Sequence, residues 1–157
     1  MDPLVLEQHL KWSKEANIGL WIAAFFAANG DSDVVLRSTI LPELKDIKVS
    51  LLYDMEYRIN ASDGWNLTNV QHDVAHMCSY YFGQDRYFSL NKRAVVFVKM
   101  TRIWYNHGIL SAIVDAMRST AWEHGYDLYL VGDQIWGNAP TNAKLPSICY
   151  ARCGDQL

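Results

Sequence analysis

The stretch Tyr126–Gly137 reads YDLYLVGDQIWG and joins an apolar run to an acid, an amide and an aromatic ring. Residues 127–133 have the length and composition of a buried strand. The run then ends on Asp133, Gln134 and Trp136. Either a simple turn or a binding site at the end of a strand explains this ending, and the rest of the chain bears on the choice.

Three similar apolar runs precede this one, and helical patterns separate them. The runs cover residues 18–26, 47–59 and 93–102, and we predict a strand in each. The first is continuously apolar, as expected of a strand covered on both faces. Helical spacing or helix end signals mark residues 2–17, 67–83 and 108–125, whereas the pattern in 34–46 breaks at Pro42.

Alternating helices and strands predict an α/β fold with a parallel sheet of about four strands. The order suits an open doubly wound sheet or part of a (β/α)8 barrel. No glycine-rich phosphate motif follows a strand, so a nucleotide-binding version lacks support. We predict one domain over residues 1–137 and an irregular C-terminal tail over 138–157.

Composition narrows the function classes. The 157 residues are half apolar with a net charge of −3, which indicates a globular domain and argues against a nucleic-acid surface. No apolar run reaches membrane-spanning length, and no signal peptide is recognised. Cys78, Cys149 and Cys153 lack the partners for a metal cage, so we expect three reduced thiols, no metal and no cofactor. The six Trp and nine Tyr fit either core packing or a surface that stacks on sugar rings.

The strand ends carry the candidate binding residues. In parallel α/β folds, ligands bind beyond the carboxyl ends of the strands. Polar and aromatic side chains gather at these ends, and Asp54 and Asp133 are the candidates for an acid or base role. The predicted substrate-binding residues are Phe26, Tyr53, Asp54, Glu56, Lys99, Arg102, Asp133, Gln134 and Trp136.

Lys99 is informative because a charged lysine is costly beneath covering helices. Alternation along the strand places Lys99 on the face of Phe97 and Thr101. It is expected to face a polar cavity at the sheet end, toward Asp54 on a neighbouring strand. A structural Asp–Lys pair without any ligand is the other reading.

Four collinear stretches between His9 and Gly137 resemble glycoside hydrolase family 99-like proteins, the relatives of endo-α-mannosidase and of the WbsX proteins. They read HLKWSKEANIGLWIAAFF, IKVSLLYDMEYRI, YYFGQDRYFSLNKRAVVFVKMTR and EHGYDLYLVGDQIWG. The resemblance implies a (β/α)8 barrel that acts on glycans and cuts α-mannosidic linkages through carboxylates. It covers framework strands, and therefore bears on fold more than on activity.

The chain departs from the family pattern at three places. Phe25-Phe26-Ala27 replaces the family's Trp-Trp-Gly, and Tyr53-Asp54 replaces its Tyr-Glu. The late Glu-Trp-His-Glu-Gly motif that carries the catalytic pair is absent; Trp122-Glu123-His124 ends a predicted helix instead.

Two functions from different classes follow. One is a carbohydrate-active domain that binds or acts on glycans at its strand ends, as an α-mannosidase-like glycoside hydrolase if it is active. The other is a non-catalytic truncated barrel or carbohydrate-binding module. Four parallel strands also leave two open sheet edges, which predict self-association.

Overall fold

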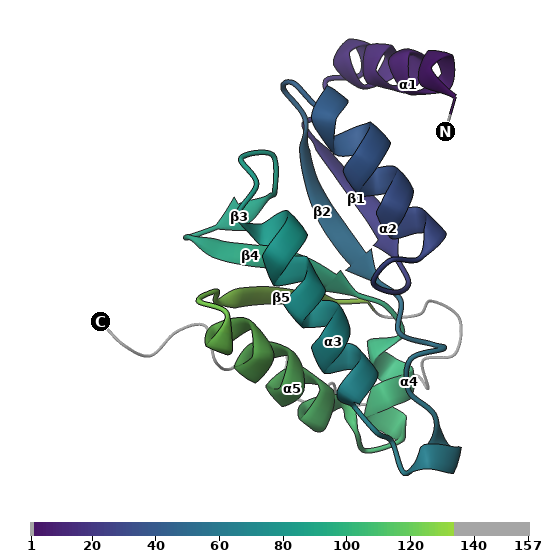
Figure 1. Ribbon diagram of the computed structural model, residues 1–157, viewed down its shortest axis with the longest axis vertical. Helices are drawn as coiled ribbons and strands as arrows, with labels where there is room; N and C mark the ends of the chain where they lie inside the picture. Colours follow the sequence, from purple (N-terminus) through teal and green to yellow (C-terminus); the bar gives the residue numbers. More distant parts are fainter. Residues whose placement is uncertain (1, 134–157) are drawn as a thin grey trace, which may run out of the picture.

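The computed structural model describes residues 2–133 and forms an α/β fold built on a mixed, mostly parallel five-stranded sheet (Figure 1). Short π-helical turns extend two helices, Leu36–Ile40 after α2 and Cys78–Phe82 after α3. In chain order the elements are α1 (Pro3–Glu15), β1 (Leu20–Phe25), α2 (Asp31–Val35), β2 (Lys48–Tyr53), α3 (Thr68–Met77), β3 (Ser89–Leu90), β4 (Arg93–Val98), α4 (Thr101–Asn106), α5 (Leu110–Glu123) and β5 (Leu128–Gly132).

The four parallel strands lie side by side in chain order, β1, β2, β4 and β5. The short β3 is antiparallel to β4 and enters between the amino-terminal halves of β2 and β4. The order of the described strands never reverses, so the sheet lacks the switch point of a doubly wound fold. The predicted alternation of helices with parallel strands is confirmed in this coarser form.

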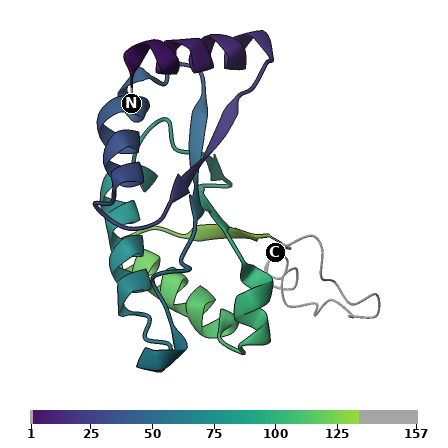
Figure 2. The same ribbon diagram turned by 90° about the vertical axis from the view of Figure 1, so that its right-hand side faces the viewer.

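One face of the sheet carries the core. Helices α2, α3 and α5 pack on this face (Figure 2), and side chains from strands and helices interlock there. Val74 and Met77 from α3, and Ile113 and Met117 from α5, have no exposed surface. The strands contribute Phe25, Val49, Leu51, Tyr53, Val96, Val98 and Leu128 to the same cluster.

The opposite face, which we term the open face, is apolar and incompletely covered by the described residues. Pairing places Ala24, Leu52, Phe97 and Val131 in one row across all four parallel strands. Ala24 is exposed, and Ile22, one strand pleat earlier, is 48% exposed. The expectation that the first strand is covered on both faces therefore fails within residues 2–133. The same pairing places Ser50 and Val95 on this face, where both are buried. The exposed or partly exposed residues of the open face are Ile22, Ala24, Leu52, Phe97, Tyr129 and Val131.

Helix α1 lies across the amino ends of β1 and β2 (Figure 1). Asp2 caps it, because the Asp2 carboxylate accepts a hydrogen bond from the Leu4 amide at 2.9 Å. Pro3 occupies the first turn, where its missing N–H costs nothing. The predicted N-terminal helix is thus confirmed with its capping signal.

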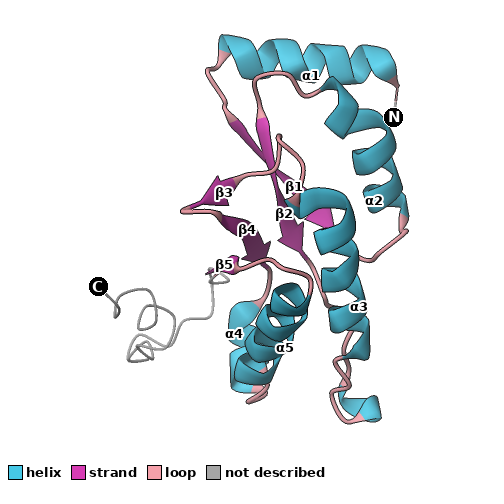
Figure 3. Cartoon of the chain, turned by 60° about the vertical axis from the view of Figure 1, so that its left-hand side comes forward, coloured by secondary structure: helices cyan, strands magenta, loops and turns pink. Residues whose placement is uncertain are grey.

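Three elements differ from the sequence prediction. The strand predicted over 47–59 ends at Tyr53, and residues 54–59 form a loop with a turn beyond it. The strand predicted over 93–102 ends at Val98, and Met100 adopts a left-handed φ of 62° that starts helix α4 (Figure 3). Arg102 therefore lies on a helix. The hairpin between β3 and β4 was missed, because its turn places Asn91 and Lys92 at positive φ without any glycine to signal it. No helix among residues 2–133 has the length and apolar character needed to cross a membrane.

Candidate functional site

The first residues after the four parallel strands form a single row at the carboxyl edge of the sheet. Backbone bonding continues one step past each strand: Asp54 N–H donates to Phe25, Lys99 N–H to Tyr53, and Asp133 N–H to Val98. Side chains alternate along a strand, so these residues follow the open-face row on the same side. We call this set the terminal row; its members are Phe26, Asp54, Lys99 and Asp133.

An ion pair occupies the centre of the terminal row. Lys99 Nζ lies 2.5 Å from Asp54 Oδ2, as the charge argument predicted. The Lys99 side chain is 40% exposed, whereas that of Asp54 is 7% exposed. The hydrogen bond to Asp54 raises the pKa of Lys99, and the charges of Glu56 and Asp133 add to the effect. The ammonium group is therefore paired with Asp54 and stays charged at neutral pH.

Asp133 anchors the start of helix α4. Its Oδ1 atom accepts the Thr101 amide hydrogen at 3.1 Å, and the Thr101 hydroxyl donates to the Asp133 carbonyl. Gly132 packs tightly beside Thr101, since a Cβ atom there would lie 2.9 Å from Thr101 Cγ2. Asp133 thus combines a local structural contact with a partly exposed carboxylate at the edge of the open face.

Of the remaining predicted site residues, some lie at or near the terminal row and others do not. Phe26 is 47% exposed at the end of the terminal row, and Glu56 is exposed beyond β2. The structure does not bring Tyr53 to this row, because its ring is buried on the helix-covered face. Arg102 is partly exposed on α4. Gln134 and Trp136 lie outside the described residues.

Sequence reasoning missed a buried carboxylate on α3 that organises the loops at this edge. Asp73 is fully buried and accepts the Tyr53 hydroxyl at 2.8 Å and the Ala28 amide at 2.9 Å. Arg58 donates twice to the same carboxylate, at 2.7 Å and 3.0 Å. Asp73 therefore ties the segments after β1 and β2 to α3. The available signal was an acid on the apolar stripe formed by Val70, Val74 and Met77.

A second buried carboxylate, Asp33 on α2, links this helix to α3. His76 Nε2 lies 2.9 Å from Asp33 Oδ2, and Tyr81 donates its hydroxyl to the other oxygen. Arg37 adds two contacts at 3.1 Å, and the Asn29 amide adds one at 2.8 Å. Burial alone raises the pKa of Asp33, but these hydrogen bonds outweigh it and lower the pKa below its ordinary value. Its full set of partners makes Asp33 a structural anchor.

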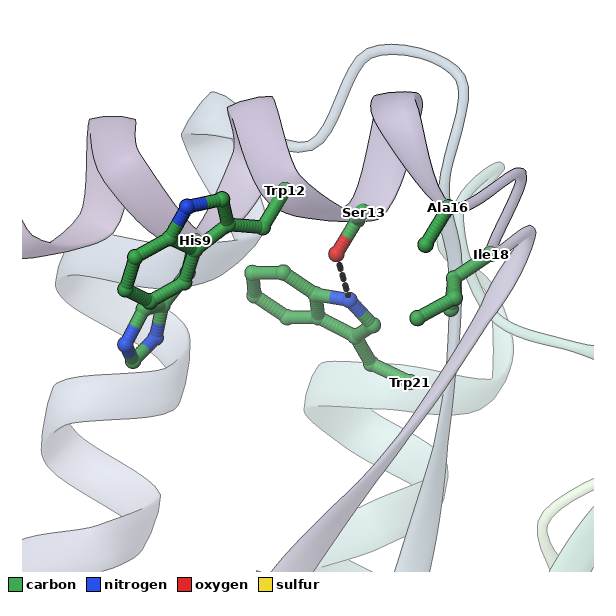
Figure 4. A pocket seen from close by; sticks show the side chains of 6 residues that line it. All are labelled: His9, Trp12, Ser13, Ala16, Ile18 and Trp21. Carbon is green, nitrogen blue, oxygen red and sulfur yellow. Dashed lines mark hydrogen bonds between the residues drawn. The ribbon is translucent and has the colours of Figure 1, made fainter.

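A small aromatic groove lies at the opposite, amino-terminal edge of the sheet, between α1 and β1 (Figure 4). Its volume is about 300 Å³. The Trp21 indole N–H donates to Ser13 Oγ at 2.8 Å, and His9 stacks on Trp12. The hydrogen bond between Trp21 and Ser13 joins β1 to α1. The groove lies at the end of the sheet opposite to the terminal row.

Within residues 2–133, no three His, Cys, Asp or Glu side chains gather closely enough to hold a metal ion. Cys78 is a buried free thiol whose pKa is raised to about 11 by burial, while Cys149 and Cys153 lie outside the described residues.

Comparison with models of known protein families, with curated proteins and with solved structures finds no match. The geometry of the strand ends is therefore the observation on which a functional proposal can rest.

Proposed function

We propose that this chain is a glycoside-hydrolase-like, family 99-like domain that binds glycans at the terminal row, on a sheet that forms part of a (β/α)8 barrel. The convergence of Asp54, Lys99 and Asp133 with the half-exposed ring of Phe26 on one sheet edge supports this proposal most directly. The sequential order of the parallel strands is also the order that a (β/α)8 barrel requires.

The chemistry of the row suits a sugar. Carboxylates accept strong hydrogen bonds from hydroxyl groups, an ammonium group donates them, and an aromatic ring covers the C–H face of a pyranose. Asp133 and Lys99 supply the polar contacts, while Phe26 supplies the apolar one. Asp54 already bonds to Lys99 and to the Glu56 amide at 3.3 Å, so its main role is to orient the lysine.

The described residues support binding more than cleavage. Glycosidases place two carboxyl groups on either side of the scissile bond, one as an acid and one as a base or nucleophile. Asp54 is ion-paired and Asp133 holds the start of α4, so neither is a free acid poised for proton transfer. A carbohydrate-binding module without hydrolytic activity is accordingly the form of the proposal that these contacts favour.

A second candidate role is purely structural. The low exposure of Asp54 and its two partners are what a structural ion pair shows, and such a pair needs no ligand. This alternative predicts that no sugar perturbs the terminal row.

Titration with an α-linked mannooligosaccharide, followed by calorimetry and by amide chemical shifts, tests the proposal. Binding is expected to shift the amides of Lys99 and Asp133 and to weaken at least tenfold in Phe26→Ala and in Asp133→Asn. Trp122→Ala is the matched control, because Trp122 is 75% exposed on α5 and lies outside the row. Equal loss of binding in the control, or shifts confined to other residues, would contradict the proposal.

A further inference from the structure

The sheet of this chain has the features of half a closed barrel. Four parallel strands follow one another in chain order, with their core helices packed on one face only (Figure 2). The open face is apolar except for the buried Ser50, and the polar terminal row lies at its carboxyl edge. In a closed eight-stranded parallel barrel, the inner face is filled by apolar side chains and the carboxyl rim carries the polar groups.

The two outer strands have unused backbone groups within the described residues. The carbonyls of Gly19 and Phe25 are bonded to β2, and alternate residues of a parallel strand point to opposite neighbours. The amides of Ile22 and Ala24 therefore point away from β2. Likewise, β5 pairs only with β4 among residues 2–133. An exposed edge of this kind recruits another strand.

We propose that two copies of this chain associate about a two-fold axis to form a closed eight-stranded barrel, with β5 of each copy paired in parallel to β1 of the other. This arrangement gives hydrogen-bond partners to the unpaired backbone groups of both β1 and β5. It also buries the two open faces against each other. It brings the two terminal rows into one ring, so a ligand site at the carboxyl rim receives residues from both copies.

The geometry of the two sheet edges favours a second copy as the occupant. Within residues 2–133, β1 pairs only with β2 and β5 only with β4. A closing partner must present two free parallel edges in the complementary order. Another copy of this sheet meets that requirement, because its β1 can pair with β5 and its β5 with β1.

The open face alone supplies about half of the area that a stable dimer interface buries per partner. Four strands about 4.8 Å apart and roughly 20 Å long give a flat face of roughly 400 Å² per copy. A stable interface buries about 800 Å² per partner. Because side chains protrude from the sheet, the accessible area of the open face is larger than this flat value. The two contacts between β5 of one copy and β1 of the other bury further area on the strand edges and on the helices beside them.

Light scattering on the full chain across a concentration series provides the first test. The expected mass is about twice the 18.0 kDa of one chain. Ile22→Lys places a charge on the open face and is expected to halve this mass. Val34→Lys is the matched control, since Val34 is 45% exposed on α2 and lies off the open face. This control should remain dimeric, and circular dichroism checks that both variants are folded.

Hydrogen exchange on the unaltered chain supplies a second test that needs no variant. Barrel closure should protect the amides of Ile22 and Ala24, and the protection should rise with protein concentration. A monomer at all concentrations overturns the proposal, whether the face is covered by other residues of the same polypeptide or left uncovered. A dimer that leaves these amides unprotected, or that survives Ile22→Lys, overturns it as well. Neither test uses a glycan, so their outcome is independent of the proposed binding function.

Discussion

Replacing Asp73 by asparagine tests the view that a buried carboxylate on α3 holds the carboxyl edge of the sheet together. The substitution preserves the shape of the side chain and removes its charge. In the native chain this carboxylate accepts four hydrogen bonds, two of them from Arg58. An amide has one acceptor oxygen, and its NH₂ group faces donors that it cannot satisfy.

The expected loss follows from these contacts. Removing one partner of a buried ion pair costs about 3–5 kcal/mol, because the other charge stays behind without compensation. The Arg58 side chain is 23% exposed, so water partly solvates the remaining charge. We therefore expect Asp73→Asn to lower the free energy of unfolding by about 3 kcal/mol, at the low end of that range. This is a large share of the roughly 5–15 kcal/mol available to a typical domain.

Urea unfolding followed by circular dichroism measures the effect. With a slope of about 2 kcal/mol per molar, the midpoint should fall by about 1.5 M. Asp63→Asn is the control, because Asp63 is exposed and its carboxylate accepts one long contact, from the Asn66 amide at 3.2 Å. A loss below about 1 kcal/mol, or equal losses in both variants, would refute the claim that Asp73 anchors the loops.

Three further outcomes are expected. Burial tends to raise the pKa of Asp33, but hydrogen bonds, chiefly from Tyr81, lower this pKa below the ordinary 3.8. The ionised Asp33 therefore contributes its full stabilisation of the fold above pH 3.8, and this contribution is lost as the pH falls through the lowered pKa. Urea midpoints between pH 5 and pH 2 should consequently depend less on pH in Asp33→Asn. The isolated chain should release no sugar from α-mannosides in a reducing-end assay, and turnover abolished by Asp54→Asn or Asp133→Asn would contradict this. Leu130→Ala should cost about 2 kcal/mol in thermal or urea melts, since the half-buried Leu130 packs on the core, whereas an unchanged melt would place its side chain outside it.

The sheet was largely predictable because its strands are short, apolar and bounded by clear signals. The run Leu128–Gly132 follows Gly125, which has a φ of 83° directly after the end of helix α5, as the predicted helix end at residue 125 indicated. The interrupted helix at Pro42 was also visible, and the structure shows a π-helical turn passing into a short 3₁₀ segment there. Local composition suffices for such elements.

The missed elements depend on backbone conformations that their residue types do not predict. Met100 adopts a left-handed φ that glycine or asparagine would usually signal, so the strand seemed to continue into α4. Lys92 does the same in the β3–β4 turn. In the hairpin, positive φ at both central residues is a requirement of the tight turn that joins β3 to β4, whatever residues occupy it.

The candidate site was predictable at the level of one residue per strand end. Alternation along the strands placed Lys99 opposite Asp54, and the structure confirms this pair. Alternation did not settle on which face the helices pack. For that reason Tyr53, one residue earlier, was grouped with the site although its hydroxyl bonds to Asp73 inside the core.

The uneven pairing of the sheet has a mechanical consequence. Six residue pairs join β1 to β2 and five join β4 to β5, whereas only three join β2 to β4, because β3 and Tyr87 enter between their amino-terminal halves. The two strand pairs β1–β2 and β4–β5 thus pair directly with each other only along their carboxyl-terminal halves, while the segment around Tyr87 bridges their amino-terminal halves. The Asp54–Lys99 ion pair adds a side-chain link between the two strand pairs at the carboxyl end. We expect a ligand that draws Lys99 away from Asp54 to weaken this link.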